Sequence, residues 1–231
     1  TNNLKKVFAN FIKSGQYLPG PKIIEFEKTI AKFCSRKFCI GVSSGSNALY
    51  LALKSMDIGK GDEVICPAIS WVATANAIAM TGAKPVFVDV NLDQNISAKC
   101  ILPAITKNTK AMVIVHFTGV IADIKNIKKI SKENFIPIIE DAAQAFGAEL
   151  NGTYAGNFGN ISSFSFNPMK VLQGFGEAGA VLTNSSIIKN KVKRMRHLGM
   201  DMNNREKCMS IELNSKIDEL QASLLLENLK N

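Results

Sequence analysis

The stretch FSFNPMKVLQGFGEAGAV, residues 164–181, decides the fold of this chain and holds one lysine, Lys170. Apolar and small residues at its two ends predict short strands over 161–166 and 180–183, joined by a glycine-rich loop that carries the lysine. The residues that flank this lysine are unusually apolar for a loop. Such a setting favours a reactive amine, although an ordinary surface lysine in a hairpin loop is the alternative.

A second informative stretch, IPIIEDAAQAFGA, lies upstream of the lysine loop. Its apolar start predicts a buried strand over 136–140, and the residues after Asp141 predict a helix over 142–147. A carboxylate at the carboxyl end of a parallel strand lies where such sheets place their ligands. The alternative is that Asp141 only caps the helix. Gln144 is predicted on the same helix face as Asp141, because the two residues are three positions apart.

A third stretch, FCIGVSSGSNA, predicts a strand over 38–43 that runs into a helix over 46–56. Small residues at such a turn let backbone N–H groups approach a phosphate, and the helix adds its positive N-terminal end. The candidates for this phosphate cradle are Ser44, Gly45, Ser46 and Asn47. A serine-rich helix cap without a ligand is the alternative.

A phosphate cradle, a strand-end carboxylate and a loop lysine, in that order, indicate pyridoxal 5′-phosphate (PLP). This cofactor needs an anion site, a partner for its ring nitrogen and an amine for its aldehyde. Ser165 is a further candidate for the phosphate, or else a small core residue. Trp71, the only tryptophan, is predicted to stack on the cofactor ring or else to pack in the core. Gln144 is a candidate hydrogen-bond partner for the phenolic oxygen of the ring.

The rest of the chain alternates short apolar runs with helical segments, which is typical of a mostly parallel sheet covered by helices on both faces. The predicted fold is a three-layer α/β domain with a seven-stranded sheet. Its strands are expected over residues 38–43, 63–66, 85–90, 111–117, 136–140, 161–166 and 180–183, and its helices over 23–33, 46–56, 71–81, 97–106, 122–132, 142–147 and 186–197. A last amphipathic helix needs a partner for its apolar residues Ile217, Leu220, Leu224, Leu225 and Leu229.

The composition argues against several classes of protein. The net charge of +9 comes from 28 Lys and Arg against 19 Asp and Glu. These basic residues are scattered, which favours a solvated basic surface over nucleic-acid binding. Five cysteines without a C-x-x-C pair, and two distant histidines, argue against a metal site and a disulfide framework. Reduced thiols predict a cytoplasmic protein, and no apolar run is long enough to span a membrane.

Beyond these separate signals, five segments resemble, in order and spacing, the motifs of the DegT/DnrJ family of sugar-nucleotide aminotransferases. They are VSSGSNALYLALKSMDIGKGDEVICPAISWVATANAI, GAKPVFVDV, EDAAQAFGA, FSFNPMK and NSKIDELQA. The resemblance runs from about residue 11 to the last residue. It implies an aspartate-aminotransferase-like large domain (PLP fold type I) and a homodimer. It also implies transfer of an amino group, usually from glutamate, to a keto carbon of a nucleotide-linked sugar.

Carried over by position, the resemblance makes Lys170 the lysine that forms a Schiff base with PLP, and Asp141 the partner of the ring nitrogen. The other cofactor contacts that it implies are Gln144 at the ring oxygen, Trp71 on the ring face, Ser46, the Asn47 backbone and Ser165 at the phosphate, and Asn214, which reaches the phosphate from the neighbouring subunit. A dehydratase branch of the family has histidine in place of the lysine, so Lys170 argues against that branch.

Departures from the family pattern concern substrate fit. Ala178 replaces a second glycine, Lys216 replaces an arginine, and the segment 117–124 lacks a usual proline. The predicted organisation is an N-terminal segment over 1–22, a PLP-binding large domain over 23–214, and over 215–231 the start of a helix that leads to a small C-terminal domain, itself largely absent. Two alternatives stay open: another PLP enzyme of this fold, such as a lyase or aldolase, and a truncated, non-catalytic protein that binds the cofactor.

Overall fold

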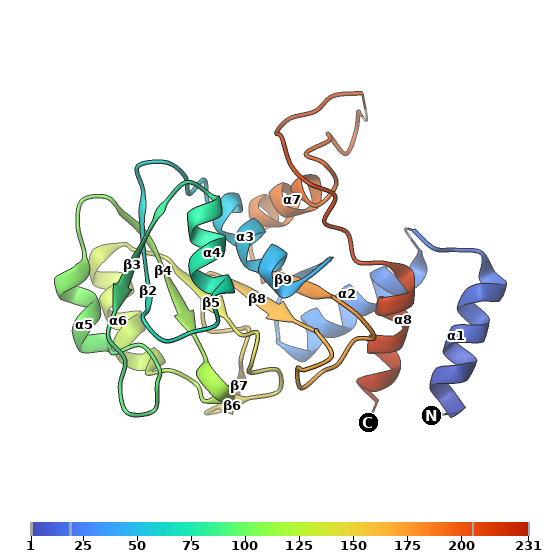
Figure 1. The fold of residues 1–231 in the computed structure, drawn as a ribbon, viewed down its shortest axis with the longest axis horizontal. Coiled ribbons are helices and arrows are strands. Elements are labelled where there is room, and N and C mark those ends of the chain that lie inside the picture. The colour runs from blue at the N-terminus through green and yellow to red at the C-terminus, as the bar shows by residue number, and fades with distance from the viewer. Residues whose placement is uncertain (1, 19, 205, 231) are drawn as a thin grey trace.

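The computed structural model describes residues 2–18, 20–204 and 206–230, and it contains a seven-stranded sheet between two layers of helices (Figure 1). All seven predicted strands form, and each begins and ends within two residues of its predicted bounds. Across the sheet they are β1 (Phe38–Val42), β9 (Gly179–Thr183), β8 (Ile161–Ser165), β5 (Ile138–Asp141), β4 (Thr109–Val115), β2 (Glu63–Pro67) and β3 (Lys84–Val88).

The sheet is mostly parallel, as predicted. Strand β2 pairs in parallel with β3 and β4, β4 pairs in parallel with β5, and β5 with β8. Only β9 among these seven strands runs the other way, because it is antiparallel to both of its neighbours, β8 and β1. The carboxyl ends of the other strands therefore meet at one edge of the sheet, which is where open α/β sheets bind their ligands.

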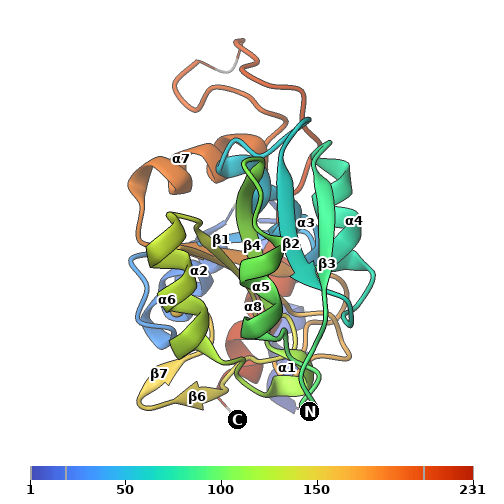
Figure 2. The same cartoon turned by 90° about the vertical axis from the view of Figure 1, so that its left-hand side faces the viewer.

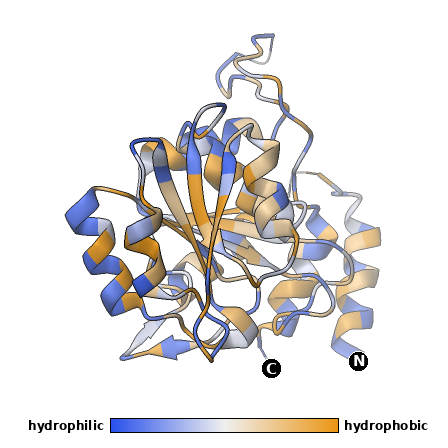
Figure 3. Ribbon diagram, turned by 60° about the vertical axis from the view of Figure 1, so that its left-hand side comes forward, coloured by the Kyte–Doolittle hydropathy of each residue, from blue (hydrophilic) through white to orange (hydrophobic). Residues whose placement is uncertain are grey.

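Helices cover both faces of the sheet, as Figure 2 shows for α4 and α6 on opposite sides. One apolar core lies between the sheet and α3 (Gly45–Ser55), α4 (Ala73–Met80) and α7 (Ser186–Met195). On the opposite face, two further cores involve α2 (Pro21–Phe33) with α8 (Glu219–Asn228), and α5 (Ala98–Ala104) with α6 (Ile124–Asn134). The central strands are mostly apolar, whereas the outer helices carry apolar and polar stripes (Figure 3). This pattern confirms the three-layer architecture.

The predicted helix over 142–147 is wrong, because these residues form successive turns instead. The N–H of Ala142 donates to the Ser163 carbonyl on β8 (2.9 Å), so the first residue is tied to the sheet. The N–H groups of Ala145 and Ala148 then bond to carbonyls three residues back, and Gly147 has a φ of +82°. Bonds to the sheet and a left-handed glycine therefore override the helix propensity of the alanines.

The apolar side of the last helix is covered within this chain. Leu224 and Leu225 of α8 are buried, and α8 packs against both α2 and α1 (Asn2–Ser14), its neighbours in Figure 1. The expected need for a partner is therefore met by helices from the other end of the sequence. None of the helices in the described part of the chain has the length and apolar character needed to cross a membrane.

Two features of the chain outside the main sheet were not predicted. A hairpin forms from β6 (Glu149–Leu150) and β7 (Thr153–Tyr154), and the short helix η1 (Phe117–Gly119) follows β4.

After α7, the segments 198–204 and 206–213 form an arm that projects away from the sheet (Figure 1). A backbone bridge between Met200 and Cys208 joins the two sides of this arm.

Candidate active site

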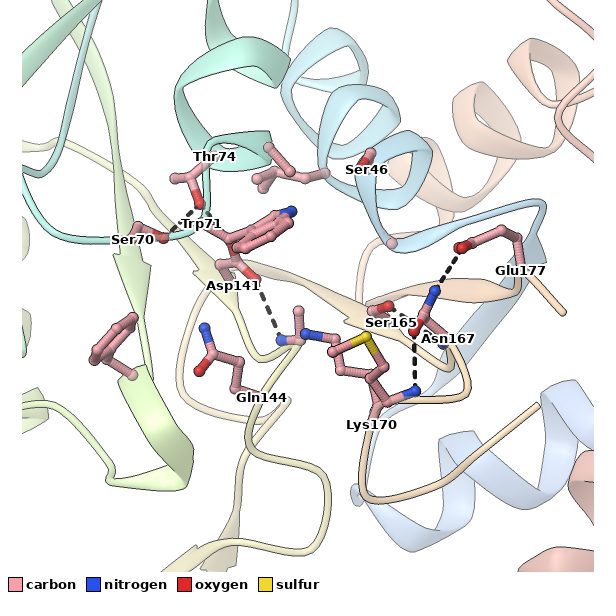
Figure 4. Close-up of a pocket in the computed structure, with 16 residues that line it drawn as sticks. Ser46, Ser70, Trp71, Thr74, Asp141, Gln144, Ser165, Asn167, Lys170 and Glu177 are labelled. Carbon is pink, nitrogen blue, oxygen red and sulfur yellow. Dashed lines mark hydrogen bonds between the residues drawn. The ribbon is translucent and has the colours of Figure 1, made fainter. Parts of the chain in front are cut away.

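A pocket of about 540 Å³ opens at the edge of the sheet where the carboxyl ends of the parallel strands meet (Figure 4). The turns that follow β1, β2, β4 and β5 all contribute to its wall, and the loop after β8 closes it. The residues that line it are Gly45, Ser46, Leu49, Ser70, Trp71, Ala73, Thr74, Phe117, Asp141, Ala143, Gln144, Ser165, Asn167, Met169, Lys170 and Glu177.

The pocket brings together most of the residues that the sequence singled out. Its lining includes Gly45, Ser46, Trp71, Asp141, Gln144, Ser165 and Lys170. Ser44 and Asn47 instead line a smaller adjoining cavity of about 300 Å³, which shares Ser46 and Trp71 with the main pocket. Asn214 is exposed and lines neither cavity.

The turn between β1 and α3 serves as a helix cap and also as a pocket wall. The Ser44 hydroxyl accepts a hydrogen bond from the Asn47 N–H (3.1 Å), so this pair caps α3. A Cβ on Gly45 would overlap the Ser165 side chain, which means that only glycine lets the turn approach β8 so closely. Ser165 thus lies beside the N-terminus of α3, Ser46 belongs to the first turn of that helix, and an anion is favoured at this end.

Asp141 is the buried carboxylate of the pocket. Its Oδ1 accepts a hydrogen bond from the Ala143 N–H (3.2 Å), and its Oδ2 accepts one from the Thr74 hydroxyl (3.0 Å). Burial raises the pKa of the Asp141 carboxyl above its ordinary value. The hydrogen bonds from Ala143 and Thr74, and the electrostatic influence of His116 and Lys170, act in the lowering direction. A cation that entered the pocket beside Asp141 would favour its ionised form.

Trp71 is 72% exposed, so it is a wall of the pocket and not a core residue. It lies just before α4, and its carbonyl accepts a hydrogen bond from the N–H of Thr74 (3.0 Å). The sequence reasoning did not select Thr74, although its spacing from Trp71, one helical turn, was a usable signal. Thr74 is buried and connects the segment that carries Trp71 to Asp141.

Lys170 lies in a turn that its own loop holds in place. Its N–H donates to the Asn167 carbonyl (2.8 Å), and the Asn167 side chain donates to Glu177 (2.5 Å) and accepts from the Met169 N–H (2.9 Å). The apolar neighbours of the lysine divide into two groups: Met169 and Val171 are 90% and 73% exposed, whereas Phe166 and Leu172 are buried. Lys170 itself is half-buried in the pocket wall, across from Asp141 (Figure 4).

Gln144 lies in the turn after β5 and not on a helix. Its side-chain oxygen accepts a hydrogen bond from the Thr118 N–H (3.0 Å) in η1. This bond fixes the amide, so that its NH₂ group is the end available to a bound molecule. Gln144 and Asp141 still reach the same pocket, because the turn brings them together without a helix.

A second buried carboxylate, Glu140, escaped the sequence reasoning. It accepts hydrogen bonds from the backbone N–H groups of Gly156, Phe158 (2.8 Å) and Gly159 (2.9 Å), and from Ser162 (3.0 Å). His116, also fully buried, lies 3.0 Å away through its Nε2. Its Nδ1 accepts from the Ala122 N–H (3.2 Å), so Nε2 carries the proton and donates to Glu140. A glutamate at the end of an apolar strand was the available signal, because a buried charge needs partners.

Comparison with known proteins places this geometry in a family. The sequence model of the DegT/DnrJ/EryC1/StrS aminotransferase family matches residues 1–231. The UDP-2-acetamido-2-deoxy-3-oxo-D-glucuronate aminotransferase of Pseudomonas aeruginosa is 37% identical over 220 residues, which are 95% of this chain and 61% of that protein. The dTDP-3-amino-3,6-dideoxy-alpha-D-galactopyranose transaminase of Aneurinibacillus thermoaerophilus is 37% identical over 223 residues, 96% of this chain and 61% of the relative.

Solved structures agree with this placement. The crystal structure of NtdA from Bacillus subtilis with bound cofactor PMP superposes with a TM-score of 0.93 at 33% identity, covering 99% of this chain and 52% of that one. A DegT DnrJ EryC1 StrS aminotransferase from Brucella abortus gives a TM-score of 0.94 at 31% identity, covering 99% and 63%. The chain spans between about half and three fifths of the length of the curated relatives that it matches. Its fold is that of these aminotransferases, and the chain belongs to the DegT/DnrJ/EryC1/StrS aminotransferase family.

Proposed function

We propose that the protein is a PLP-dependent aminotransferase that moves an amino group from an amino acid, glutamate by preference, to a keto carbon of a nucleotide-linked sugar. The observation that carries the proposal is a single pocket with Lys170 and Asp141 in its wall and the α3 N-terminus at one end. Family membership and the names of the UDP- and dTDP-sugar relatives support this substrate class. The net charge of +9 favours an anionic substrate.

The residues of the pocket fit PLP. Asp141 forms no ion pair within the described ranges 2–18, 20–204 and 206–230, so its carboxylate is available to a protonated ring nitrogen. Gly45 is packed closely against Ser165, so the N–H groups at the α3 N-terminus and the hydroxyls of Ser46 and Ser165 are the donors that would hold the phosphate. Trp71 offers an exposed indole face to an aromatic ring. When bound, PLP carries the amino group and accepts electrons from the substrate carbon.

Each residue then has a physical task. The Lys170 amine would hold the cofactor through its aldehyde, and as a free amine it would be placed to move a proton at the substrate carbon. Asp141 keeps the ring nitrogen protonated, which requires that its own carboxyl stay ionised. The Gln144 NH₂ group can donate to the ring oxygen, because its carbonyl end is already occupied by Thr118. Ser46, Ser165 and the turn with Ser44 and Asn47 orient the phosphate.

We further propose a homodimer in the cytoplasm. Asn214 is exposed at the base of the projecting arm, away from its own pocket, so it is free to reach the phosphate site of a neighbouring subunit. Cys34, Cys39 and Cys66 are buried as free thiols, a state that a reducing compartment maintains.

A spectroscopic titration tests the proposed function. The purified protein with PLP should show the visible absorption of a lysine-bound cofactor, and added glutamate should abolish it. A nucleotide-linked keto sugar should then restore the band, whereas the free sugar should not. A band that does not respond to any amino acid would favour a protein that only binds the cofactor.

A further inference from the structure

A chain of hydroxyl groups leads from the pocket wall to Asp141. The Ser70 and Thr74 hydroxyl oxygens lie 2.8 Å apart, and the Thr74 hydroxyl lies 3.0 Å from Oδ2 of Asp141. Thr74 is only 2% exposed, whereas Ser70 lines the pocket. Figure 4 shows the three side chains in sequence along one wall. None of the tasks assigned above uses Ser70 or Thr74.

The directions of these hydrogen bonds follow from the number of protons. An ionised carboxylate only accepts, so the single hydroxyl proton of Thr74 goes to Asp141. The Thr74 oxygen must then accept from Ser70, which acts as the donor. Because the Ala143 N–H occupies the other carboxylate oxygen, each oxygen of Asp141 has one fixed donor. Two such bonds set the plane of the carboxylate and leave lone pairs for the pocket.

We propose that Thr74 is the positioning residue of this site, which holds the Asp141 carboxylate ionised and aimed at the cofactor ring nitrogen, with Ser70 as its support. The inference rests on the proposed function for the identity of the cofactor. The effect of Thr74 on Asp141 is inferred from the hydrogen-bonded hydroxyl groups alone.

The same threonine also links the ring-nitrogen partner to the ring-stacking residue. Its N–H donates to the Trp71 carbonyl (3.0 Å), while its hydroxyl donates to Asp141. One residue on the first turn of α4 therefore connects the Trp71 backbone to the Asp141 carboxylate. A cofactor ring held by both groups would depend on this connection.

Electrostatics give the inference a test that needs no cofactor. Burial raises the pKa of Asp141, the bonds from Ala143 and Thr74 lower it, and the titratable groups that face it are His116 and Lys170. A carboxyl with a raised pKa binds more protons in the folded state than in the unfolded one. Ionisation of Asp141 therefore lowers the free energy of unfolding as the pH rises from 3.8, the ordinary pKa of this group, through its raised pKa in the folded state. Thr74→Val should enlarge this loss, because one lowering bond disappears.

The experiment compares Thr74→Val, Thr74→Ser and Ser70→Ala with the wild type. Urea unfolding of the cofactor-free proteins gives the free energy of unfolding from about pH 4 to about pH 7. Its fall with pH should be steeper for Thr74→Val than for the wild type, slightly steeper for Ser70→Ala, and unchanged for Thr74→Ser. The added slope should vanish when Thr74→Val is combined with Asp141→Asn. Thr183→Val is the matched control, since Thr183 is also a buried threonine and lies at the last residue of β9. This substitution should change the free energy of unfolding by the same amount at every pH.

With the cofactor bound, Thr74→Val should lower kcat roughly 10- to 100-fold with little change in KM, and Thr74→Ser should restore it. An unchanged pH slope in Thr74→Val, or a slope that persists in the Asp141→Asn background, would overturn the inference. If Thr74→Val does not fold, Ser70→Ala decides the question, because a pH slope equal to that of the wild type in this variant would overturn the inference. A wild-type protein that binds no PLP would refute the proposed function instead, and the pH slopes would still stand.

Discussion

At the scale of single residues, two neighbouring carboxylates on β5 point to opposite faces of the sheet, as successive strand residues do. Burial would raise the pKa of Glu140, but the hydrogen bond from His116 and the backbone N–H groups of Gly159 and Gly156 hold it below its ordinary value. Asp141 has fewer donors, and burial holds its pKa above the ordinary value. Glu140 is therefore a satisfied structural charge, whereas Asp141 still has room for a cationic ligand.

Asp141→Asn tests the functional carboxylate. An amide cannot keep a ring nitrogen protonated, so transamination should fall roughly 100-fold or more, whereas the cofactor should still bind through Lys170 and the phosphate site. Rates at saturating glutamate and the affinity for PLP are the measurements to compare. Near-native turnover by the variant would contradict the role of Asp141.

Glu140→Gln tests the structural carboxylate. The new NH₂ group faces hydrogen-bond donors, so unfolding at neutral pH should become easier by about 3–5 kcal/mol. The wild-type advantage should shrink in acid. A carboxylate whose pKa is lowered by folding stabilises the folded state at pH values above its pKa in the unfolded chain, near 4.5. This contribution is lost as the pH falls through the lower pKa of the folded state. Glu133→Gln, on the exposed side of α6, is the control. Equal acid sensitivity of wild type and Glu140→Gln would count against the account.

At the scale of elements, α2 and α8 depend on one buried side chain. The Glu219 carboxylate accepts hydrogen bonds from the N–H groups of Lys22 (2.6 Å) and Ile23 (3.2 Å), so the first turn of α8 caps the start of α2. Glu219→Ala should cost about 1–3 kcal/mol in urea unfolding, because it leaves these donors unsatisfied. Gly20→Ala should also destabilise, since a Cβ there would overlap the same carboxylate. Glu25→Ala, an exposed change on α2, should stay within about 0.5 kcal/mol; an equal loss there would contradict the capping role.

The elements that the sequence predicted are those with a strong local pattern. Apolar runs such as VIVHF and IPII located the strands, and the order of the chemical motifs located the pocket. The turn after Asp141 was missed because its hydrogen bonds reach β8, which local propensity does not register. Thr74 was missed for the same reason, since its bond to Asp141 spans 67 residues of sequence.

At the scale of the whole molecule, the arm after α7 and the rim of the pocket both expose apolar side chains. Ile211 and Leu213 on the arm are 99% and 70% exposed, and Met169 at the rim is 90% exposed. Because α1 and α2 cover α8, the arm and the pocket rim are better candidates than α8 for burial in a dimer. A symmetric dimer would bring the arm of one subunit, with Asn214 at its base, to the pocket of the other.

We expect PLP to strengthen this dimer, because a ligand that contacts both subunits favours the assembled state. Sedimentation at micromolar concentration, with and without PLP, measures the effect. Asn214→Ala should weaken both the PLP affinity and the PLP-dependent association, whereas Asn184→Ala, on the side of the sheet away from the pocket, should weaken neither. A monomer that holds PLP tightly, with Asn214→Ala silent, would rule out the shared site.

Borohydride reduction shows whether the chain binds PLP through the lysine of its glycine-rich loop. The protein is incubated with PLP, reduced, digested and analysed by mass spectrometry, with Lys170→Ala treated in parallel. We expect a pyridoxyl group on Lys170 in the wild type and no stoichiometric labelling in the variant. A pyridoxyl group on any other lysine in stoichiometric amount, or an unlabelled wild-type protein, would contradict this expectation.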